Sequence, residues 1–195
     1  SEVNVIGSNY VFSKRGYADL PRNFTTAEAN LAPTTMNDKS LLAIFDHKIN
    51  SDWKFTAQLA YFNYQQEGAS LWPWGFNADN DSLLQRGISS WDVLGTSKMG
   101  QMFLNGEVKT GNISHKIVAG IDMGNKDYYH DWNQGAALGS PDFNIYAPVY
   151  GNAVAPVFDR TKSMKERGVR YYNGYTGMYV QDEIGFLDNK LRLTL

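Results

Sequence analysis

The sequence predicts an all-β fold, an antiparallel meander of about six strands, and three observations support this prediction. Three segments alternate apolar and polar residues with a period of two, which is typical of strands that have two different faces. Each segment has a short polar turn near its middle and is therefore predicted to be a β-hairpin. Long connections, about 65–97 and 124–170, join the hairpins.

The first hairpin is predicted over 41–64, with its turn at 50–52. Its second strand places apolar and polar residues on opposite faces. Trp53 and Tyr61 lie at the two ends of the apolar face, about 25 Å apart by the usual rise per residue. The members of this face are Trp53, Phe55, Ala57, Leu59 and Tyr61.

The second hairpin is predicted over 98–123 and turns at 110–112, where Gly111 suits the positive φ that tight hairpin turns need. Apolar residues alternate with polar ones on both of its strands. The apolar set is Met102, Leu104, Gly106 and Val108 on the first strand, and Ile113, Ile117, Ala119, Ile121 and Met123 on the return.

The third hairpin turns at 187–189, a run of Leu, Asp and Asn. After the turn, Leu191, Leu193 and Leu195 alternate with polar residues. Neither face of the strand over 175–184 is cleanly apolar, so its facing stays open. Elsewhere, a slip of one residue would invert a whole strand, so one side of the sheet is expected to carry a single apolar set. That set is Phe55, Leu59, Met102, Leu104, Ile117, Ile121, Leu191 and Leu193.

Two segments carry a resemblance to a known family. Residues 178–195 read MYVQDEIGFLDNKLRLTL, and residues 105–122 follow the pattern N-G-x-x-x-T-G-x-I-x-H-K-x-x-A-G-I-D. Both segments resemble hairpins in the barrels of TonB-dependent outer-membrane receptors, especially ferrichrome-type siderophore receptors. The order of short turns and long loops supports this resemblance independently, because such barrels have short periplasmic turns and long extracellular loops.

The resemblance implies that residues 1–195 form a middle section of one 22-stranded transmembrane barrel, without its plug domain. The extracellular loops would then be 1–40, 65–97 and 124–170, with a short helix near 26–31. About six strands cannot close around so wide a lumen. We therefore expect a piece of a larger protein, whose two free edge strands invite self-association.

The function implied by the resemblance is receptor-mediated uptake of ferric siderophores, ferrichrome-like, across the outer membrane of a Gram-negative-type bacterium. The expected partners are the ferric siderophore, the outer-membrane lipid and, through the absent plug, the TonB complex. No cofactor and no nucleic-acid partner is expected, and the net charge of −2 gives no support to a basic binding surface. Two alternatives stay open: a receptor of the same class for a vitamin or oligosaccharide, and a secreted soluble β-domain that binds carbohydrate through loop tryptophans.

Two aromatic segments, 71–76 and 127–132, are the candidate ligand contacts, and both are predicted to be loop tips. Aromatic rings suit the apolar faces of a chelate, and arginines suit its oxygen atoms. The alternative is that these rings only pack the loops together. The candidate ligand-binding residues are Trp72, Trp74, Phe76, Arg86, Tyr128, Tyr129, Trp132 and Arg160.

Rival site chemistries have weaker support. Asp127, His130 and Asp131 are close enough in sequence to join a cation, but one His with two acids is a weak pattern. His47 and His115 have serines nearby, yet no hydrolase or phosphate-binding motif occurs, so no enzyme is expected. The chain has no Cys, which excludes thiolate metal sites, and no apolar run of the ~20 residues a transmembrane helix needs.

Overall fold

The computed structural model describes residues 19–21 and 24–195, and it confirms the all-β prediction. Within those residues, strands dominate and the one helix has four residues. No helix in this part of the chain is long and apolar enough to cross a membrane. The elements are β1 (Thr35–Lys48), β2 (Trp53–Glu67), β3 (Ala69–Phe76), β4 (Leu83–Ser90), β5 (Asp92–Thr110), β6 (Ile113–Asp131), β7 (Gly135–Asn144), α1 (Met164–Arg167), β8 (Val169–Phe186) and β9 (Leu191–Thr194).

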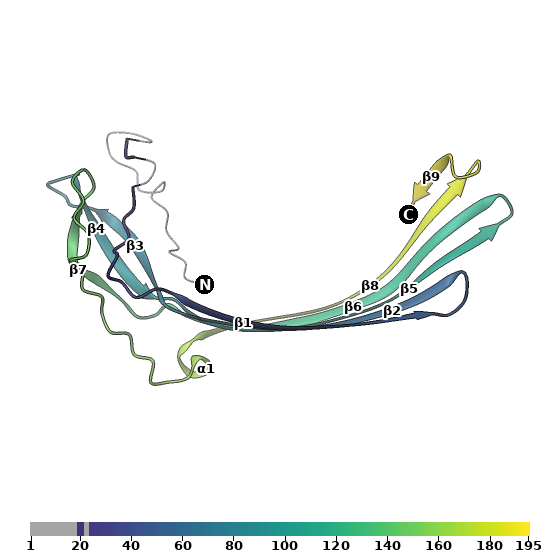
Figure 1. Ribbon diagram of the computed structural model, residues 1–195, viewed down its shortest axis with the longest axis horizontal. Coiled ribbons are helices and arrows are strands. Elements are labelled where there is room, and N and C mark those ends of the chain that lie inside the picture. The colour runs from purple at the N-terminus through teal and green to yellow at the C-terminus, as the bar shows by residue number, and fades with distance from the viewer. Residues whose placement is uncertain (1–18, 22–23) are drawn as a thin grey trace. The chain divides into compact units, whose positions relative to one another are not determined.

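Six strands form one sheet in the order β1-β2-β5-β6-β8-β9, and three form a second sheet in the order β3-β4-β7 (Figure 1). The first order confirms the predicted meander, including both pairings across the long connections. Neighbours in sequence pair directly because tight turns reverse the chain. The smaller sheet is formed by residues from those two connections.

Several sequence-based boundaries are wrong. The connections 65–97 and 124–170 are not irregular loops, since β3, β4 and β7 lie within them. The segments 71–76 and 127–132 are not loop tips, because β3 runs to Phe76 and β6 to Asp131. The predicted helix near 26–31 is absent from the described chain, which has no regular secondary structure over 24–28 and a turn at 29–30. Residues 1–18 of the predicted first loop lie outside the described residues.

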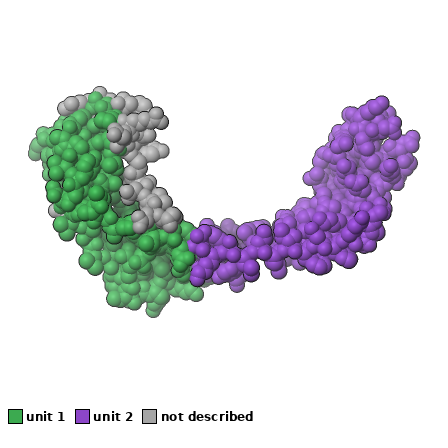
Figure 2. All heavy atoms as spheres, viewed as in Figure 1, with its two compact units in different colours: residues 1–37, 64–94, 129–170 green, residues 38–63, 95–128, 171–195 purple. Residues whose placement is uncertain are grey.

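The chain divides into two compact units, coloured separately in Figure 2. Unit 1 comprises 1–37, 64–94 and 129–170, and unit 2 comprises 38–63, 95–128 and 171–195. The long strands contribute residues to both units. The second sheet lies in unit 1, and all the predicted hairpin turns lie in unit 2.

Two turns of unit 2 contain residues with positive φ, which Gly, Asp and Asn tolerate and Leu does not favour. Gly111 has φ +63°, and Leu187, Asp188 and Asn189 have φ values of 52°, 55° and 64°. In the first hairpin, the Asn50 side-chain oxygen accepts hydrogen bonds from the backbone N–H groups at positions 52 and 53. These local interactions reverse the chain and set the register of each hairpin.

Contacts across β2, β5 and β6 define one face of unit 2. A Cβ atom at Gly106 would lie 2.3 Å from the Trp53 ring, so Trp53 packs over the Gly106 backbone. A Cβ atom at Gly100 would lie 3.5 Å from both Leu59 and Met123. These residues therefore share a face, and alternation adds its other members. They are Phe55, Met102, Leu104, Ile117 and Ile121.

The same face continues over β8 and β9. His115 Nδ1 on β6 lies 2.7 Å from Asp182 Oδ2 on β8, so these two residues share the face. Ile184 lies two positions after Asp182 on β8, therefore on the same face, and it pairs with Leu193 of β9. The predicted apolar set is thereby confirmed on one side of the sheet. The facing of β8, left open by its sequence, is also decided: Met178 and Val180, 81% and 75% exposed, alternate onto the apolar side.

Unit 1 contains a buried core under its three-stranded sheet. Its strands pair antiparallel, with Trp72 opposite Gly87 and Leu84 opposite Phe143. One apolar cluster is formed by Phe24, Leu84, Phe143 and Ile145, with Leu20, Phe76 and Tyr146 packed against it. A second cluster is formed by Ile88, Leu138 and Ala153, flanked by Leu31, Ala69, Leu71 and Phe158. The candidate site is built on this packed framework.

Candidate functional site

An aromatic cluster lies where β3, β5 and β6 contribute to unit 1. It consists of Trp72, Trp91, His130 and Trp132. The Trp91 ring centre lies 5.6 Å from that of Trp72, 4.6 Å from His130 and 6.4 Å from Trp132. His130 and Trp132 are 4.7 Å apart and edge to face. These spacings are in the favourable range for aromatic pairs.

The cluster presents apolar surface to solvent on a rigid base. Trp72 is 40% exposed and Trp132 is 47% exposed, whereas His130 is buried. Burial disfavours the charged imidazolium and lowers the pKa of His130, although Asp131 and Asp92 oppose the shift. The base of the cluster is therefore neutral at pH 7, and its two outer rings are available for stacking on a ligand.

Trp74 is held separately on the same strand. A Cβ atom at Gly87 of β4 would lie 1.8 Å from the Trp74 indole, so only glycine leaves room for this ring. The indole is nevertheless 58% exposed. Phe76, two residues on, packs against the buried Phe24 cluster instead.

An arginine–aspartate network adjoins the aromatic cluster. It consists of Asp92, Asp131, Arg160 and Arg167. Arg160 Nε lies 2.8 Å from Asp92 Oδ2, and Arg167 Nη1 lies 2.9 Å from the same oxygen. Arg167 also pairs with Asp131. Both aspartates are almost fully buried, so each charge needs these partners.

Gly68 connects the network to the aromatic cluster. Its N–H donates to Asp92, and its carbonyl oxygen accepts from both Arg160 and the Trp91 N–H. Burial alone would raise the pKa of Asp92. Hydrogen bonds from Arg160, from the Gly68 N–H and from Arg167 outweigh that effect and hold the pKa below its ordinary value. Asp92 is therefore ionised at neutral pH, and the segment that carries Arg160 is fastened to the start of β5.

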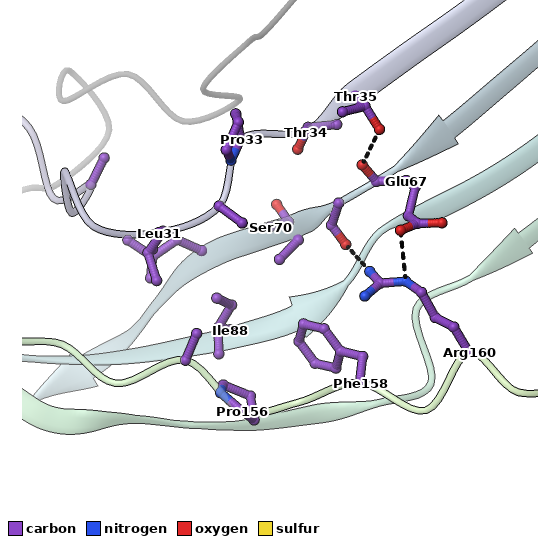
Figure 3. A pocket seen from close by; sticks show the side chains of 16 residues that line it. Leu31, Pro33, Thr34, Thr35, Glu67, Ser70, Ile88, Pro156, Phe158 and Arg160 are labelled. Carbon is purple, nitrogen blue, oxygen red and sulfur yellow. Dashed lines mark hydrogen bonds and ion pairs between the residues drawn. The ribbon is translucent and has the colours of Figure 1, made fainter.

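A pocket of about 230 Å³ lies beside Arg160 (Figure 3). Segments 31–35, 67–71 and 155–160 surround it, and Ile88 forms its floor in the view. Most of the lining is apolar, whereas Glu67 and Arg160 lie together at one end. None of the four aromatic-cluster residues lines this pocket.

The two predicted arginines have different environments. Arg86 is 2% exposed and donates to the Glu28 carboxylate at 2.6 Å and to the Thr26 carbonyl at 2.9 Å, while its guanidinium stacks on Phe143. Because Arg86 is enclosed in this way, it has a structural role, and we leave it out of the proposed ligand surface. Arg160 is partly exposed and lies at the pocket.

The two predicted tyrosines do not join the aromatic cluster. Tyr128 belongs to unit 2, where its ring centre is 6.2 Å from that of Tyr171. Tyr129 belongs to unit 1 and lies beside Gly168 and the Arg170 guanidinium. Trp72 and Trp132 are therefore the predicted aromatic residues that the fold brings together, with Trp91 between them.

The rival metal hypothesis gains no support. Asp131 is engaged by Arg167 and Gln134, and His130 packs among tryptophan rings. No group of His, Cys, Asp or Glu in the described part of the chain has the geometry to hold a metal ion. For the enzyme alternative, the Ser114 hydroxyl bonds Asn189, whereas His115 pairs with Asp182.

Sequence reasoning missed Trp91 and Asp92, which stand at the centre of the cluster and of the network. In the sequence, these two residues are a Trp-Asp pair at the end of a polar stretch. A buried pair and a surface pair would look the same there. Arg167 follows one basic and one acidic neighbour on α1, so its sequence is equally ambiguous. The partners of Asp92 lie up to 75 residues away in the chain.

The fold and site define an all-β chain with a six-stranded sheet, a three-stranded sheet and an exposed aromatic cluster. No family model matches the chain. It is similar to the ferrioxamine B receptors of Salmonella typhimurium strains SL1344 and LT2, each 26% identical over 151 residues, which is 77% of this chain. The chain spans 20% of those relatives.

A solved structure shares the fold. The crystal structure of BauA, the ferric preacinetobactin receptor from Acinetobacter baumannii, matches with a TM-score of 0.57 and 17% sequence identity. The match covers 83% of this chain and 24% of BauA. The fold of this chain is therefore similar to that of the matched part of BauA.

Proposed function

We propose that this chain is part of an outer-membrane receptor for TonB-dependent uptake of ferric siderophores. The observation that carries the proposal is the apolar face of unit 2: one side of a six-stranded sheet exposes large hydrophobic side chains along its strands. Water disfavours so large an apolar surface, and a lipid bilayer suits it. The likeness to two receptors of ferric siderophores adds the transport function.

In this proposal, the hairpin turns at 50–52, 110–112 and 187–189 face the periplasm. The segments 1–40, 65–97 and 124–170 would be extracellular. A TonB complex would act through a plug domain, and the remaining wall of a 22-stranded barrel would complete the lumen. The expected location is the outer membrane of a Gram-negative-type bacterium.

The aromatic cluster is the proposed contact for the chelate. Trp72 and Trp132 expose ring faces over a base held by Trp91, and Trp74 is exposed on the same strand as Trp72. Rigid aromatic rings bind an apolar ligand face with little loss of conformational entropy. Of the other predicted contacts, Arg160, Tyr128 and Tyr129 remain proposals, and a ferrichrome-like hydroxamate chelate is the substrate proposed.

The test replaces Trp72, Trp74 and Trp132 with Ala in the full-length receptor. Loss of two or three stacking contacts of about 0.5–1.5 kcal/mol each should weaken binding about tenfold or more. Trp53→Phe, a tryptophan replacement in unit 2, is the control and should bind normally. Binding is measured by the quenching of protein fluorescence as a ferric hydroxamate siderophore, or its iron-free form, is added. Unchanged affinity and uptake in the triple variant would remove the aromatic cluster from the site.

The exposed tryptophans could also stack on a sugar ring. The experiment therefore also tests the two alternatives, an oligosaccharide receptor and a carbohydrate-binding domain. The same variants are therefore titrated with oligosaccharides and with a corrinoid vitamin. Binding of an oligosaccharide, lost in the triple variant, together with no binding of ferric siderophore would replace the proposed substrate. Recovery of the protein without detergent as a soluble monomer would contradict the membrane location.

A further inference from the structure

The pocket beside Arg160 has an apolar body of defined size. Its volume of about 230 Å³ corresponds to roughly eight water-sized groups at about 30 Å³ each. Leu31 and Pro33 stand on the opposite side of it from Pro156 and Phe158 (Figure 3). These walls come from three separate chain segments of unit 1, which the sheet and the arginine–aspartate network hold together.

One buried polar group of this pocket lacks a partner. Ser70 lines the pocket and is 2% exposed, and its hydroxyl makes no hydrogen bond to any described residue. A buried hydroxyl without a partner costs free energy, so native proteins normally satisfy it. A ligand oxygen or nitrogen in the pocket would supply the missing hydrogen bond.

Arg160 adds donors at the end of the pocket. Its Nε and Nη2 groups donate to Asp92 and to the Gly68 carbonyl. Its Nη1 group donates to no described residue. The guanidinium therefore keeps two N–H groups for an acceptor, while its position stays fixed by Asp92.

The surrounding charges select an uncharged ligand. Arg160 and Arg167 face three carboxylates, those of Asp92, Asp131 and Glu67, with Glu67 3.8 Å from Arg160. The positive charge of Arg160 is thus already balanced, and an added anion would meet a net negative surrounding. A cation would have to leave water for mainly apolar walls, and Glu67, the carboxylate that lines the pocket, already faces Arg160.

We propose that this pocket binds a small uncharged molecule with a carbonyl group and a short hydrocarbon chain, such as a primary amide of about eight non-hydrogen atoms. The carbonyl oxygen accepts from Arg160 Nη1, the amide or carbonyl group bonds the Ser70 hydroxyl, and the chain packs on Ile88, Leu31 and Phe158. The four aromatic-cluster residues proposed to contact the chelate do not line this pocket, and Arg160 is the residue that both proposals use.

The experiment titrates the refolded chain, in one detergent throughout, with hexanamide, hexanoate and hexylamine. Binding is followed by ¹³C-methyl NMR, with the Ile88 signal assigned through Ile88→Val. Hexanamide should shift this signal with Kd near or below about 1 mM, and both charged analogues should bind at least about tenfold more weakly. Tighter binding of hexanoate than of hexanamide, or no shift up to about 10 mM, would overturn the proposal.

Two variants test the contacts. Ser70→Ala should weaken hexanamide binding about three- to tenfold, and the matched change Ser82→Ala, outside the pocket, should not. Ala155→Leu, from the exposed side of the lining, should fill the cavity and abolish binding. Tryptophan fluorescence verifies that each variant folds. Equal binding of all three ligands, with no effect of Ser70→Ala, would show nonspecific filling by hydrocarbon and sink the proposal.

Failure here would not affect the proposed transport function. Ser70→Ala in the full-length receptor should leave siderophore affinity unchanged, whereas the aromatic variants should leave hexanamide binding unchanged. The two sets of measurements therefore test the pocket proposal and the transport proposal independently.

Discussion

The two units of this chain, which Figure 2 colours separately, place their apolar side chains in opposite ways. Every large, fully buried apolar residue of the described chain lies in unit 1: Phe24, Leu84, Ile88, Val93, Leu138, Phe143 and Ile145. No such residue occurs in unit 2 as described, where Leu41, Phe45, Leu59, Met178 and Val180 are more than half exposed. Unit 1 therefore has a buried apolar core, whereas unit 2 exposes an apolar face.

Their polar side chains differ accordingly. In unit 1, buried charges pair with one another, as Arg86 does with Glu28. In unit 2, polar groups bond across strands on both faces: Thr56 donates to Asp46 and Gln101 donates to Tyr179 on the face opposite the apolar set, whereas His115 pairs with Asp182 on the apolar side. Strand geometry is common to both units, so the secondary structure by itself does not decide which residues are buried.

The largest expected effect is in unit 1, on Arg86→Met. This change leaves Glu28 buried without its cation and should cost about 3–5 kcal/mol of unfolding free energy. Urea unfolding followed by tryptophan fluorescence measures it, because four of the five tryptophans are in unit 1. The double variant Glu28→Leu/Arg86→Met should recover most of the loss, since both charges are then gone. A double variant as unstable as the single one would contradict this account.

The next effect is in unit 2 and depends on the proposed membrane location. Leu59→Arg in the full-length receptor should cost about 2–4 kcal/mol of barrel stability, because the new charge would face lipid. Gln58→Arg, on the opposite face, is the control and should cost much less. Stability is read from the heat-dependent shift of the folded band in gel electrophoresis. Equal tolerance of both changes would show that this face does not meet lipid.

Acid should lower the stability of unit 1 and so increase the difference between the two units. The pKa of His130 is lowered by burial, so the unfolded chain binds the extra proton, and that stability is lost as pH falls through about 6.5. The pKa of Asp92 is also lowered, so its contribution is present above about pH 4 and lost below it. Thermal unfolding at a series of pH values should show unit 1 weakening in these two steps. His130→Phe should remove the first step; an unchanged profile would refute its assignment.

The smallest effect concerns the last turn of unit 2. Leu187 has φ 52°, a left-handed conformation that is costly for a bulky side chain, and it is exposed. Leu187→Asn should stabilise the β8–β9 hairpin by up to about 1 kcal/mol, because Asn tolerates this conformation. Hydrogen exchange of the β9 amides reports the change. Asn189→Leu, which adds strain in the same turn, should accelerate exchange, and a change in the opposite direction would exclude backbone strain as the cause.

The hairpins were predictable because their information is local. Alternation and the turn residues at Gly111 and 187–189 act over a few positions, and the structure confirms them. The second sheet was not predicted, since Pro73 and Gly75 in β3 are normally turn residues. Both are tolerated here because β3 is an edge strand and its register shifts between them.

The candidate site was predictable only in part. Trp72 and Trp132 stand out in the sequence, but their common neighbour Trp91 carries no distinguishing signal. Arg86 and Arg160 were equivalent candidates from sequence, yet one is buried against Glu28 and the other is at a pocket. That difference depends on residues 58 and 68 positions away. No local pattern encodes such distances.

The sequence by itself determined the all-β class, the meander order and the apolar face of unit 2, because a period of two and a turn residue act on neighbouring positions. The tertiary structure alone decided the facing of β8, the second sheet and its core, the burial of Arg86 and the union of Trp72, Trp91 and Trp132. The physical reason is that burial and ion pairing depend on segments that meet only after the strands have paired, and the chain order does not state which segments those are.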